Sequence, residues 1–323
     1  MRSLSAAPLT AAALALLFLP ACAQMGTLKA MKSYKAANQA YQSQDYKRSA
    51  QLYEDAIQSA PDEPKIAPSY FFLANSYDNL WKPSKRGDPE NDKLLQLAVD
   101  NYQKAAEKLG ASDDPQNKRL SKLSLAYLVS AYGADKLNDP GKAEPVVQKM
   151  IQMEPGDPTN YFTLAKLYED AGVYDAAENV LLRAKEARPS DSAVYMTLAG
   201  YYNRQGEFGK TMDALQQRAT KEPSNPEAYY TIATFYWDEA FRDARLKEAE
   251  KKDYVNKGIG AIDHALKIKP DYAEALVYKG LLLRLEANLE KDRDKQQSLL
   301  KEADQLRDKA NELRKQKAAG VGP

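Results

Sequence analysis

Residues 161–189 read YFTLAKLYEDAGVYDAAENVLLRAKEARP, and this stretch decides the fold. From Tyr161, apolar residues recur at i, i+3, i+4 and i+7, the spacing of one face of a helix. A turn at 170–173 follows, and Ala177, Leu181 and Ala184 then mark the apolar face of a second helix. Pro189 ends that helix, because proline cannot continue one. The stretch therefore predicts two short amphipathic helices joined by a glycine turn.

The same pattern returns along the chain at a fixed distance. From Tyr161 to Tyr195 is 34 residues, and from Pro189 to Pro223 is again 34. A fixed period of this size is the signature of a helical solenoid, in which each helix pair buries its apolar face against its neighbours.

The stretch resembles the tetratricopeptide repeat (TPR) family. It has an aromatic residue, a leucine, a small residue and a tyrosine in the first helix. The turn glycine follows, and the second helix has its alanines and closing proline. The resemblance implies an all-α fold, a right-handed α-solenoid of about seven TPR-like helix pairs. It also implies one small residue per repeat where helices cross, at Ala37, Ala74, Ala131, Ala165, Ala199, Ala233 and Gly280.

Repeats two, six and seven depart from the pattern, because they carry inserts of 12, 13 and 11 residues between their helices. The first insert, residues 81–92, is rich in Pro, Gly and Asp and predicts a loop, with Trp81 as a possible partner contact. Its acidic residues do not form a calcium loop, since Lys93 and Val99 stand where glycine and glutamate are needed. The other two inserts are charged and predict longer helices. Residues 110–118 are expected to form a linker, and Arg218 replaces a usually small residue of repeat five.

The first 22 residues have the composition of a targeting segment. The apolar run of residues 11–19 is too short to span a bilayer. It ends in Leu19-Pro20-Ala21-Cys22, which resembles a bacterial lipoprotein signal and implies lipidation of Cys22. The alternatives are an ordinary secretory signal and translation from Met25. The resulting domain prediction is a signal peptide (1–22), a tether (23–31), the TPR solenoid (32–314) and a disordered tail (315–323).

Composition argues against several functions. The chain has 46 basic and 45 acidic residues, so it lacks the basic field of a nucleic-acid-binding protein. Its single cysteine excludes an internal disulfide framework. Its only histidine, His264, has no companion for catalysis, and no phosphate-binding or hydrolase motif occurs. We therefore expect no enzyme activity, no cofactor and no metal.

The binding surface follows from the resemblance. In TPR proteins the first helices line a concave groove, and residues at fixed positions after the leading aromatic face it. Aromatic rings there can bury a partner, and amides can bond a peptide backbone. The alternative is that individual rings pack against the next repeat. The implied groove residues are Tyr34, Asn38, Phe71, Asn75, Tyr132, Phe162, Lys166, Met196, Asn203, Tyr230 and Trp237.

These features predict a non-catalytic, membrane-tethered scaffold or adaptor that binds partner proteins or peptides during assembly of a cell-envelope complex. The alternative is a receptor that captures free peptides or envelope fragments. The predicted location is the periplasmic face of a bacterial membrane, and the residue after Cys22, Ala23, favours the outer membrane over the inner one.

Overall fold

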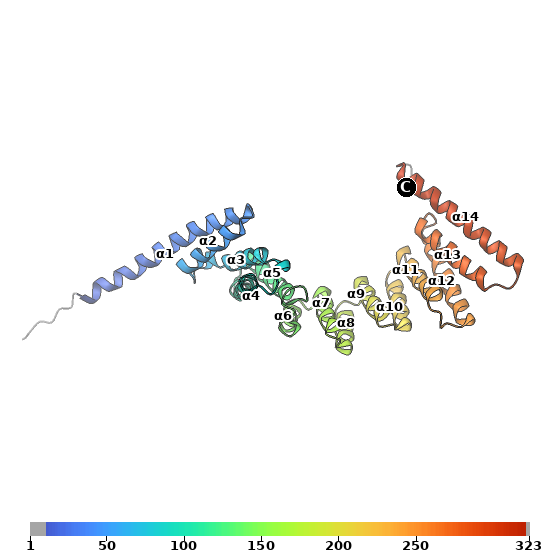
Figure 1. Cartoon of the computed structure of the whole chain (residues 1–323), viewed down its shortest axis with the longest axis horizontal. Helices are drawn as coiled ribbons and strands as arrows, with labels where there is room; N and C mark the ends of the chain where they lie inside the picture. The colour runs from blue at the N-terminus through green and yellow to red at the C-terminus, as the bar shows by residue number, and fades with distance from the viewer. Residues whose placement is uncertain (1–10, 321–323) are drawn as a thin grey trace, which may run out of the picture. The chain divides into compact units, whose positions relative to one another are not determined.

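The computed structural model describes residues 11–320 of the chain, with side chains from residue 24 onward. The chain divides into two compact units, one ending at Val173 and the other beginning at Tyr174. The described residues hold fourteen α-helices and no strand (Figure 1). Fourteen is the number that seven helix pairs require, so the prediction of an all-α fold built from TPR-like helix pairs is confirmed.

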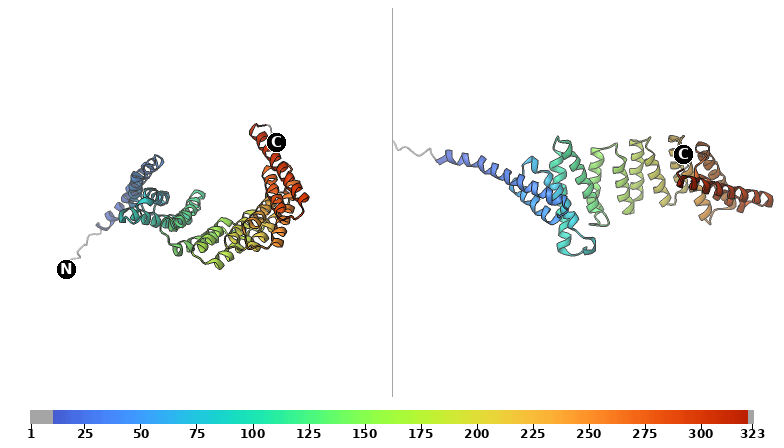
Figure 2. Two further views of the ribbon diagram at one scale, coloured as in Figure 1. Left: turned by 45° about the vertical axis from the view of Figure 1, so that its right-hand side comes forward. Right: turned by 90° about the horizontal axis from the view of Figure 1, so that it is seen from above.

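Among the described residues, the first unit contains seven α-helices and two short 3₁₀ helices, η1 (Pro64–Ile66) and η2 (Pro83–Lys85). Within this unit, each α-helix packs against the next α-helix of the unit (Figure 2). The α-helices are α1 (Ala11–Gln42), α2 (Tyr46–Ser59), α3 (Pro68–Leu80), α4 (Pro89–Gly110), α5 (Pro115–Tyr132), α6 (Pro140–Met153) and α7 (Pro158–Asp170).

The second unit contains the other seven helices of the described residues. Here too, contacts join helices that are adjacent in the chain, as expected for a repeat array. The helices are α8 (Tyr174–Ala187), α9 (Ser192–Arg204), α10 (Phe208–Lys221), α11 (Pro226–Arg242), α12 (Glu248–Ile268), α13 (Ala273–Leu289) and α14 (Arg293–Ala318).

Capping residues that can be recognised in the sequence mark the starts of many helices. A side-chain oxygen of the N-cap residue accepts a backbone N–H of the first turn, and this typically stabilises a helix by about 1 kcal/mol. Proline often follows at the first helical position, where its missing N–H costs nothing. The capping residues are Asp45, Asp88, Asp114, Asp139, Asp157, Asp191, Asn225 and Asp292.

The turn inside a repeat requires a left-handed residue. Gly172 and Gly206 have φ of 74° and 73°, a region that glycine enters without steric cost. The chain then turns back, and the N–H of Val173 bonds the carbonyl of Tyr168 at 2.8 Å. Gln44 has φ 61° at the same place in repeat one, so a non-glycine residue adopts the same turn there.

The small residues predicted at the helix crossings are all buried. Gly280 shows why: a Cβ atom there would lie 3.2 Å from the carbonyl oxygen of Ala303 on the neighbouring helix. A larger side chain at such a crossing would force the helices apart. The buried set is Ala37, Ala74, Ala131, Ala165, Ala199, Ala233 and Gly280.

A tyrosine–glutamate hydrogen bond joins consecutive repeats at three places. The hydroxyl of Tyr202 on α9 donates to Glu178 on α8 at 2.8 Å, and that of Tyr168 on α7 donates to Glu144 on α6 at 2.6 Å. Tyr77 on α3 donates to Glu54 on α2 in the same way. The last tyrosine of the first helix thus fixes its repeat to the preceding one.

The insert of repeat two is shorter as a loop than the sequence predicts. The loop covers residues 81–88, and α4 begins at Pro89 because Asp88 caps it. Trp81 is buried, and its indole N–H donates to Asp92 at 3.4 Å, so this ring anchors the loop rather than facing a partner. The predicted linker is also shorter, since only residues 111–114 separate α4 from α5.

The charged inserts lengthen helices, as predicted. α11 and α12 have 17 and 21 residues, whereas α9 and α10 have 13 and 14. α14 continues to Ala318, beyond the predicted start of the tail at 315, and Lys315 and Lys317 in its last turn complement the helix dipole. Arg307 is exposed on α14, as expected for a helix that caps an array.

The N-terminal end differs from the prediction in its secondary structure. Residues 23–31, predicted as a tether, are helical and continue α1, and Ala30 is buried against Ala56 and Ile66. The predicted signal residues 1–10 and the side chain of Cys22 lie outside the described residues. Among the described residues, no helix combines the length and apolar character that crossing a membrane requires.

Candidate binding surface

Five aromatic side chains of α11, α13 and the N-cap position of α13 form a continuous series, which we call the aromatic row. Tyr230 contacts Tyr272 and Tyr278, with ring centroids 5.2 and 5.3 Å apart. Tyr278 in turn meets Trp237 edge to face at 5.7 Å, and Trp237 stacks on Phe241 at 5.1 Å. Such pairs stabilise one another beyond their burial, so the row is a rigid apolar strip.

The row is only partly covered by the protein. Phe241 is 60% exposed, and the other four rings are half-buried. Ala233 and Ile262 lie beneath them in a buried cluster. Burial above all, and then the neighbouring Tyr278, raises the pKa of Tyr230, so its hydroxyl stays neutral and available as a donor.

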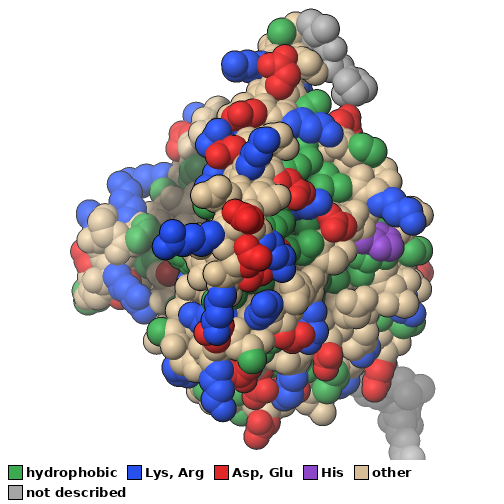
Figure 3. Space-filling view, turned by 90° about the vertical axis from the view of Figure 1, so that its right-hand side faces the viewer, with side chains coloured by type: hydrophobic (Ala, Val, Ile, Leu, Met, Phe, Trp, Pro, Cys, Tyr) green, Lys and Arg blue, Asp and Glu red, His purple; other side chains and the backbone are tan. Residues whose placement is uncertain are grey.

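Charged residues of both signs border the row: Glu227 accepts the hydroxyl of Tyr272, and the ammonium of Lys269 lies 5.4 Å from the centre of that ring. Asp238 and Arg242 pair at 2.7 Å on the same helix, and they line a pocket of about 290 Å³ together with Asn203. In the space-filling view, hydrophobic side chains lie among interspersed basic and acidic ones (Figure 3). The surface therefore suits a segment with apolar anchors rather than a highly charged ligand.

Sequence reasoning identifies two of the five rings. Tyr230 and Trp237 occupy predicted groove positions, and Tyr278 brings them into one surface. Sequence reasoning missed Phe241 because this residue lies one turn beyond the ordinary repeat, on the lengthened part of α11. The i, i+4 spacing of Trp237 and Phe241 is the signal that could have found it.

Three predicted groove residues of the first unit are buried and are not available to a partner. Phe71, Asn75 and Tyr132 are 5%, 7% and 4% exposed. Asn75 accepts from the hydroxyl of Tyr41 at 2.7 Å and donates to that of Tyr102 at 3.1 Å. Phe71 meets Tyr127 of the next repeat at 6.0 Å, which is the alternative that the sequence left open, whereas Tyr132 accepts from Gln103 of the preceding repeat at 3.0 Å.

Four further predicted residues of this unit are half-buried or form contacts within it. Asn38 accepts the hydroxyl proton of Tyr53 at 2.6 Å, and the half-buried ring of Tyr34 lies 6.1 Å from that of Tyr53. On α7, Phe162 is half-buried, and exposed Lys166 pairs with Asp170 one turn away. In the described residues, the first unit thus offers fewer free groove groups than the sequence predicts.

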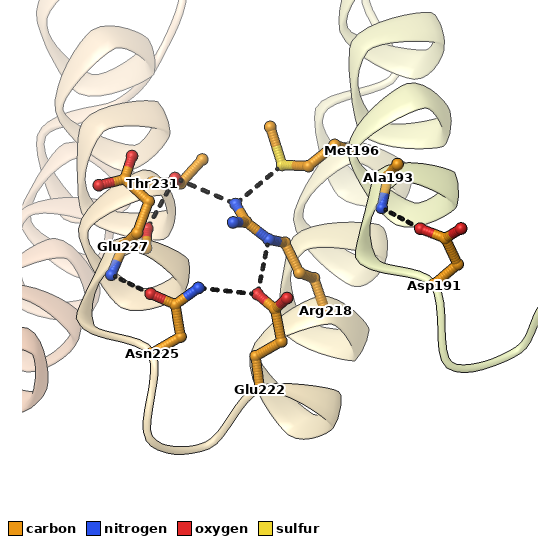
Figure 4. A network of polar contacts seen from close by, with 8 residues as sticks. All are labelled: Asp191, Ala193, Met196, Arg218, Glu222, Asn225, Glu227 and Thr231. Atoms are coloured by element: carbon orange, nitrogen blue, oxygen red, sulfur yellow. Dashed lines mark hydrogen bonds and ion pairs between the residues drawn. The ribbon is translucent and has the colours of Figure 1, made fainter.

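Arg218 occupies the position where a small residue was expected, and it joins three helices (Figure 4). Its guanidinium donates to Glu222, the C-cap residue of its own helix α10, at 3.1 Å and to Thr231 on α11 at 3.5 Å. It also approaches the sulfur of Met196 on α9, a predicted groove residue, at 3.1 Å. The side chain is only 11% exposed, so a hydrogen-bonded cation here does the joining that small residues do elsewhere.

The carboxylate of Glu222 depends on this network. Burial raises its pKa, but hydrogen bonds from Ser192 and Asn225 and the charge and bond of Arg218 outweigh burial and leave the pKa lowered. A lowered folded-state pKa stabilises the fold above the unfolded value of 4.5, and this contribution is lost as pH falls through the folded value.

Replacing Arg218 by alanine is expected to lower the free energy of unfolding by about 1–2 kcal/mol at pH 7, below the cost of breaking a fully buried pair. The loss should be smaller at pH 3, below the unfolded value of 4.5, because the stabilisation that comes from the lowered pKa of Glu222 fades on that side. Urea unfolding at both pH values, followed by tryptophan fluorescence, measures it. Lys257→Ala, which breaks an exposed pair with Asp253, is the control and should change little. If the loss of stability were equal at both pH values, it would come from the cavity left by the missing Arg218 side chain and not from its interaction with Glu222.

The remaining chemically distinctive residue is His264, which lies on the surface (Figure 3). Its ring stacks on that of Tyr229, with centroids 3.9 Å apart. Within the described residues, no group of three potential ligand side chains is placed to hold a metal ion. Asp88 and Asp92 of the predicted loop instead accept backbone N–H groups of Glu90 and Gly87.

The sequence comparisons agree with this architecture. Residues 136–200 match the sequence model of the tetratricopeptide repeat family. This match and the helix-pair fold confirm the predicted resemblance to TPR proteins. A search of the curated proteins finds no match.

Several solved TPR structures align with the chain. The C-terminal part of a TPR repeat-containing protein from Cytophaga hutchinsonii has 16% identity and a TM-score of 0.50, covering 87% of this chain and 98% of that one. A tetratricopeptide repeat protein from Parabacteroides merdae has 13% identity and a TM-score of 0.43, covering 85% and 99%. YrrB, described as a TPR protein with an unusual peptide-binding site, has 16% identity and a TM-score of 0.37, covering 62% and 91%.

The alignment with the Cytophaga protein supports the fold alone. The TPR fold is a scaffold for binding proteins or peptides, and TPR proteins are in general non-catalytic.

Proposed function

We propose that this protein is a non-catalytic scaffold or adaptor that binds a partner protein or peptide through the aromatic row. The observation that carries the proposal is the continuity of the five half-buried or exposed rings of the aromatic row. Exposed, preformed aromatic strips are where binding energy concentrates in protein interfaces. The even charge around the row favours a partner segment that inserts apolar side chains, as a helix or an extended peptide.

The membrane tether forms the second part of the proposal. The Leu19-Pro20-Ala21-Cys22 pattern supports lipidation of Cys22 at the periplasmic face of a bacterial membrane, the outer more than the inner. Acyl chains on Cys22 would hold the protein stably at that surface. A tethered scaffold without nucleic-acid or cofactor binding fits the assembly of a cell-envelope complex.

Photocrosslinking in cells tests the partner surface. A photoreactive residue at Phe241 should capture a defined partner segment, whereas one at Tyr174, also exposed but outside the row, should not. The captured segment is then synthesised and titrated while the fluorescence of Trp237 is followed. Tyr230→Ala with Phe241→Ala should weaken binding by about 30-fold or more, the effect expected of hot-spot residues. Unchanged affinity would remove the row as the site.

The same experiment distinguishes the scaffold from the alternative function, a receptor for free peptides or fragments. A scaffold captures a folded protein through one segment, whereas a receptor captures short free peptides. The tether is tested by metabolic labelling with a fatty-acid analogue, which Cys22→Ser should abolish. Absence of label in the wild type would refute the tether and leave the aromatic row untouched.

A further inference from the structure

One side of the middle part of α1, at residues 25–35, is covered by no other part of the described structure. The opposite side packs on the first repeat: a Cβ atom at Gly26 would lie 2.7 Å from the carbonyl oxygen of Ser59, and Ala30 is buried. On the free side, Met25, Leu28 and Met31 are 72%, 71% and 37% exposed. Figure 1 shows that α1 extends well past α2 toward its N-terminal end.

Lysines share this side with the three apolar residues. Met25, Leu28, Lys32 and Lys35 follow the i, i+3, i+7, i+10 spacing of one helix face, and Lys29 borders it. We call these residues, with Met31, the outer face of α1. None of its lysines forms an ion pair among the described residues, and all are exposed. The chain has no acidic residue before Asp45, although its overall charge is balanced.

We propose that the outer face of α1 lies on an anionic lipid surface. Methionine and leucine would enter the boundary between headgroups and acyl chains, and the lysines would contact lipid phosphates. Charge complementarity supports this occupant, because every charged residue of the face is basic. Its position supports it too, since Gly26, which packs against Ser59 of the first repeat, lies only four residues after the predicted lipidation site.

The inference deepens the proposed membrane tether, since it gives the first repeat a fixed contact with the membrane. Acyl chains alone hold a protein near a bilayer without orienting it. A helix that is packed on its own repeat and seated in the interface would also set the orientation of that repeat. A membrane is favoured over an acidic protein because apolar and basic residues intermix along one helix beside the proposed anchor.

Vesicle flotation tests the inference on a chain that begins at Gln24. Every described side-chain contact falls within residues 24–320, so this chain keeps all of them. It also lacks Cys22, so the result does not depend on lipidation. The probes are phosphatidylcholine vesicles with and without phosphatidylglycerol. We expect binding to the anionic vesicles only, weakening with added salt.

Three sets of substitutions give the result its specificity. Lys29→Gln, Lys32→Gln and Lys35→Gln together should weaken partitioning about 100-fold, about fivefold per lysine near an anionic surface. Met25→Gln, Leu28→Gln and Met31→Gln together should weaken it at least about tenfold. The control removes three exposed lysines from α14, Lys301, Lys309 and Lys315, and should bind like the wild type. Circular dichroism verifies that all variants stay helical.

Several outcomes would overturn the inference. These are equal binding to neutral and anionic vesicles, loss of binding in the α14 control, or full binding by either outer-face variant. Absence of vesicle binding, with crosslinks from position 28 to a protein in cells, would assign the face to a protein partner instead. Fatty-acid labelling of Cys22 is measured separately, so the tether and the outer face can fail independently.

Discussion

Replacing Tyr102 by alanine is expected to lower the free energy of unfolding of the first unit by about 3–5 kcal/mol, the cost of truncating a buried aromatic ring. Tyr102 is fully buried on α4 and is the meeting point of three helices. It stacks on Tyr127 of α5 at 5.2 Å and lies 6.1 Å from Phe71 of α3. Its loss would also leave the amide of Asn75 without its acceptor, which adds a desolvation cost.

The two tryptophans of the chain make this measurable, because Trp81 lies in the first unit and Trp237 in the second. In a Trp237→Phe background, urea unfolding followed by Trp81 fluorescence reports the first unit. The control is Tyr102→Phe, which keeps the ring and should cost only about 1–2 kcal/mol. If both variants lost the same stability, the ring packing would not be what holds the three helices together.

Glycine-to-leucine substitutions two residues apart on α12 are expected to have opposite effects. A Cβ atom at Gly258 would lie 2.8 Å from Leu282 Cδ2 and 3.3 Å from Tyr236 Cβ. Leu282 is itself fully buried, so Gly258→Leu should destabilise the second unit by about 3 kcal/mol, at the upper end for overpacking. A Cβ atom at Gly260 would meet nothing within 4 Å, and Gly260→Leu should stabilise the helix by about 0.5–1 kcal/mol.

This comparison holds substitution and helix constant, so only the neighbouring atoms differ. Trp237 fluorescence in a Trp81→Phe background measures unfolding of the second unit. Equal destabilisation by both substitutions would mean that leucine is poorly tolerated on α12 for a reason other than the contact with Leu282. A neutral Gly258→Leu would mean that α12 and α13 can separate at little cost.

The repeat architecture could be predicted because each level of the sequence agrees with it. Small residues recur where helices cross, aspartate caps precede prolines, and glycine stands at the left-handed turn of repeats four and five. The limits of helices were harder to predict. α4 takes residues 89–92 from the predicted loop because Asp88 caps it, a local hydrogen bond that composition does not reveal.

The binding surface could be predicted only in part, because a repeat pattern fixes a position on a helix and not its exposure. Phe71 and Tyr230 hold the same repeat position, yet Phe71 is 5% exposed and Tyr230 remains half-buried. Tyr102 and Tyr127 surround Phe71 with rings from two further helices, so what covers it depends on residues far along the chain. The joining role of Arg218 could not be predicted either, because Met196 and Thr231 lie on two other helices.

The spacing of the helices in the second unit would allow one complete helix pair to be removed or duplicated. Residues 188–191 connect α8 to α9, and residues 222–225 connect α10 to α11, so both connections have four residues and both lead into a capped helix. Excising residues 188–221 would remove 34 residues and join α8 to α11 through a native connection. A gene encoding such a chain can gain or lose one 34-residue unit and keep a native connection at the new junction. Selection can therefore change the number of repeats without changing the residues of the aromatic row.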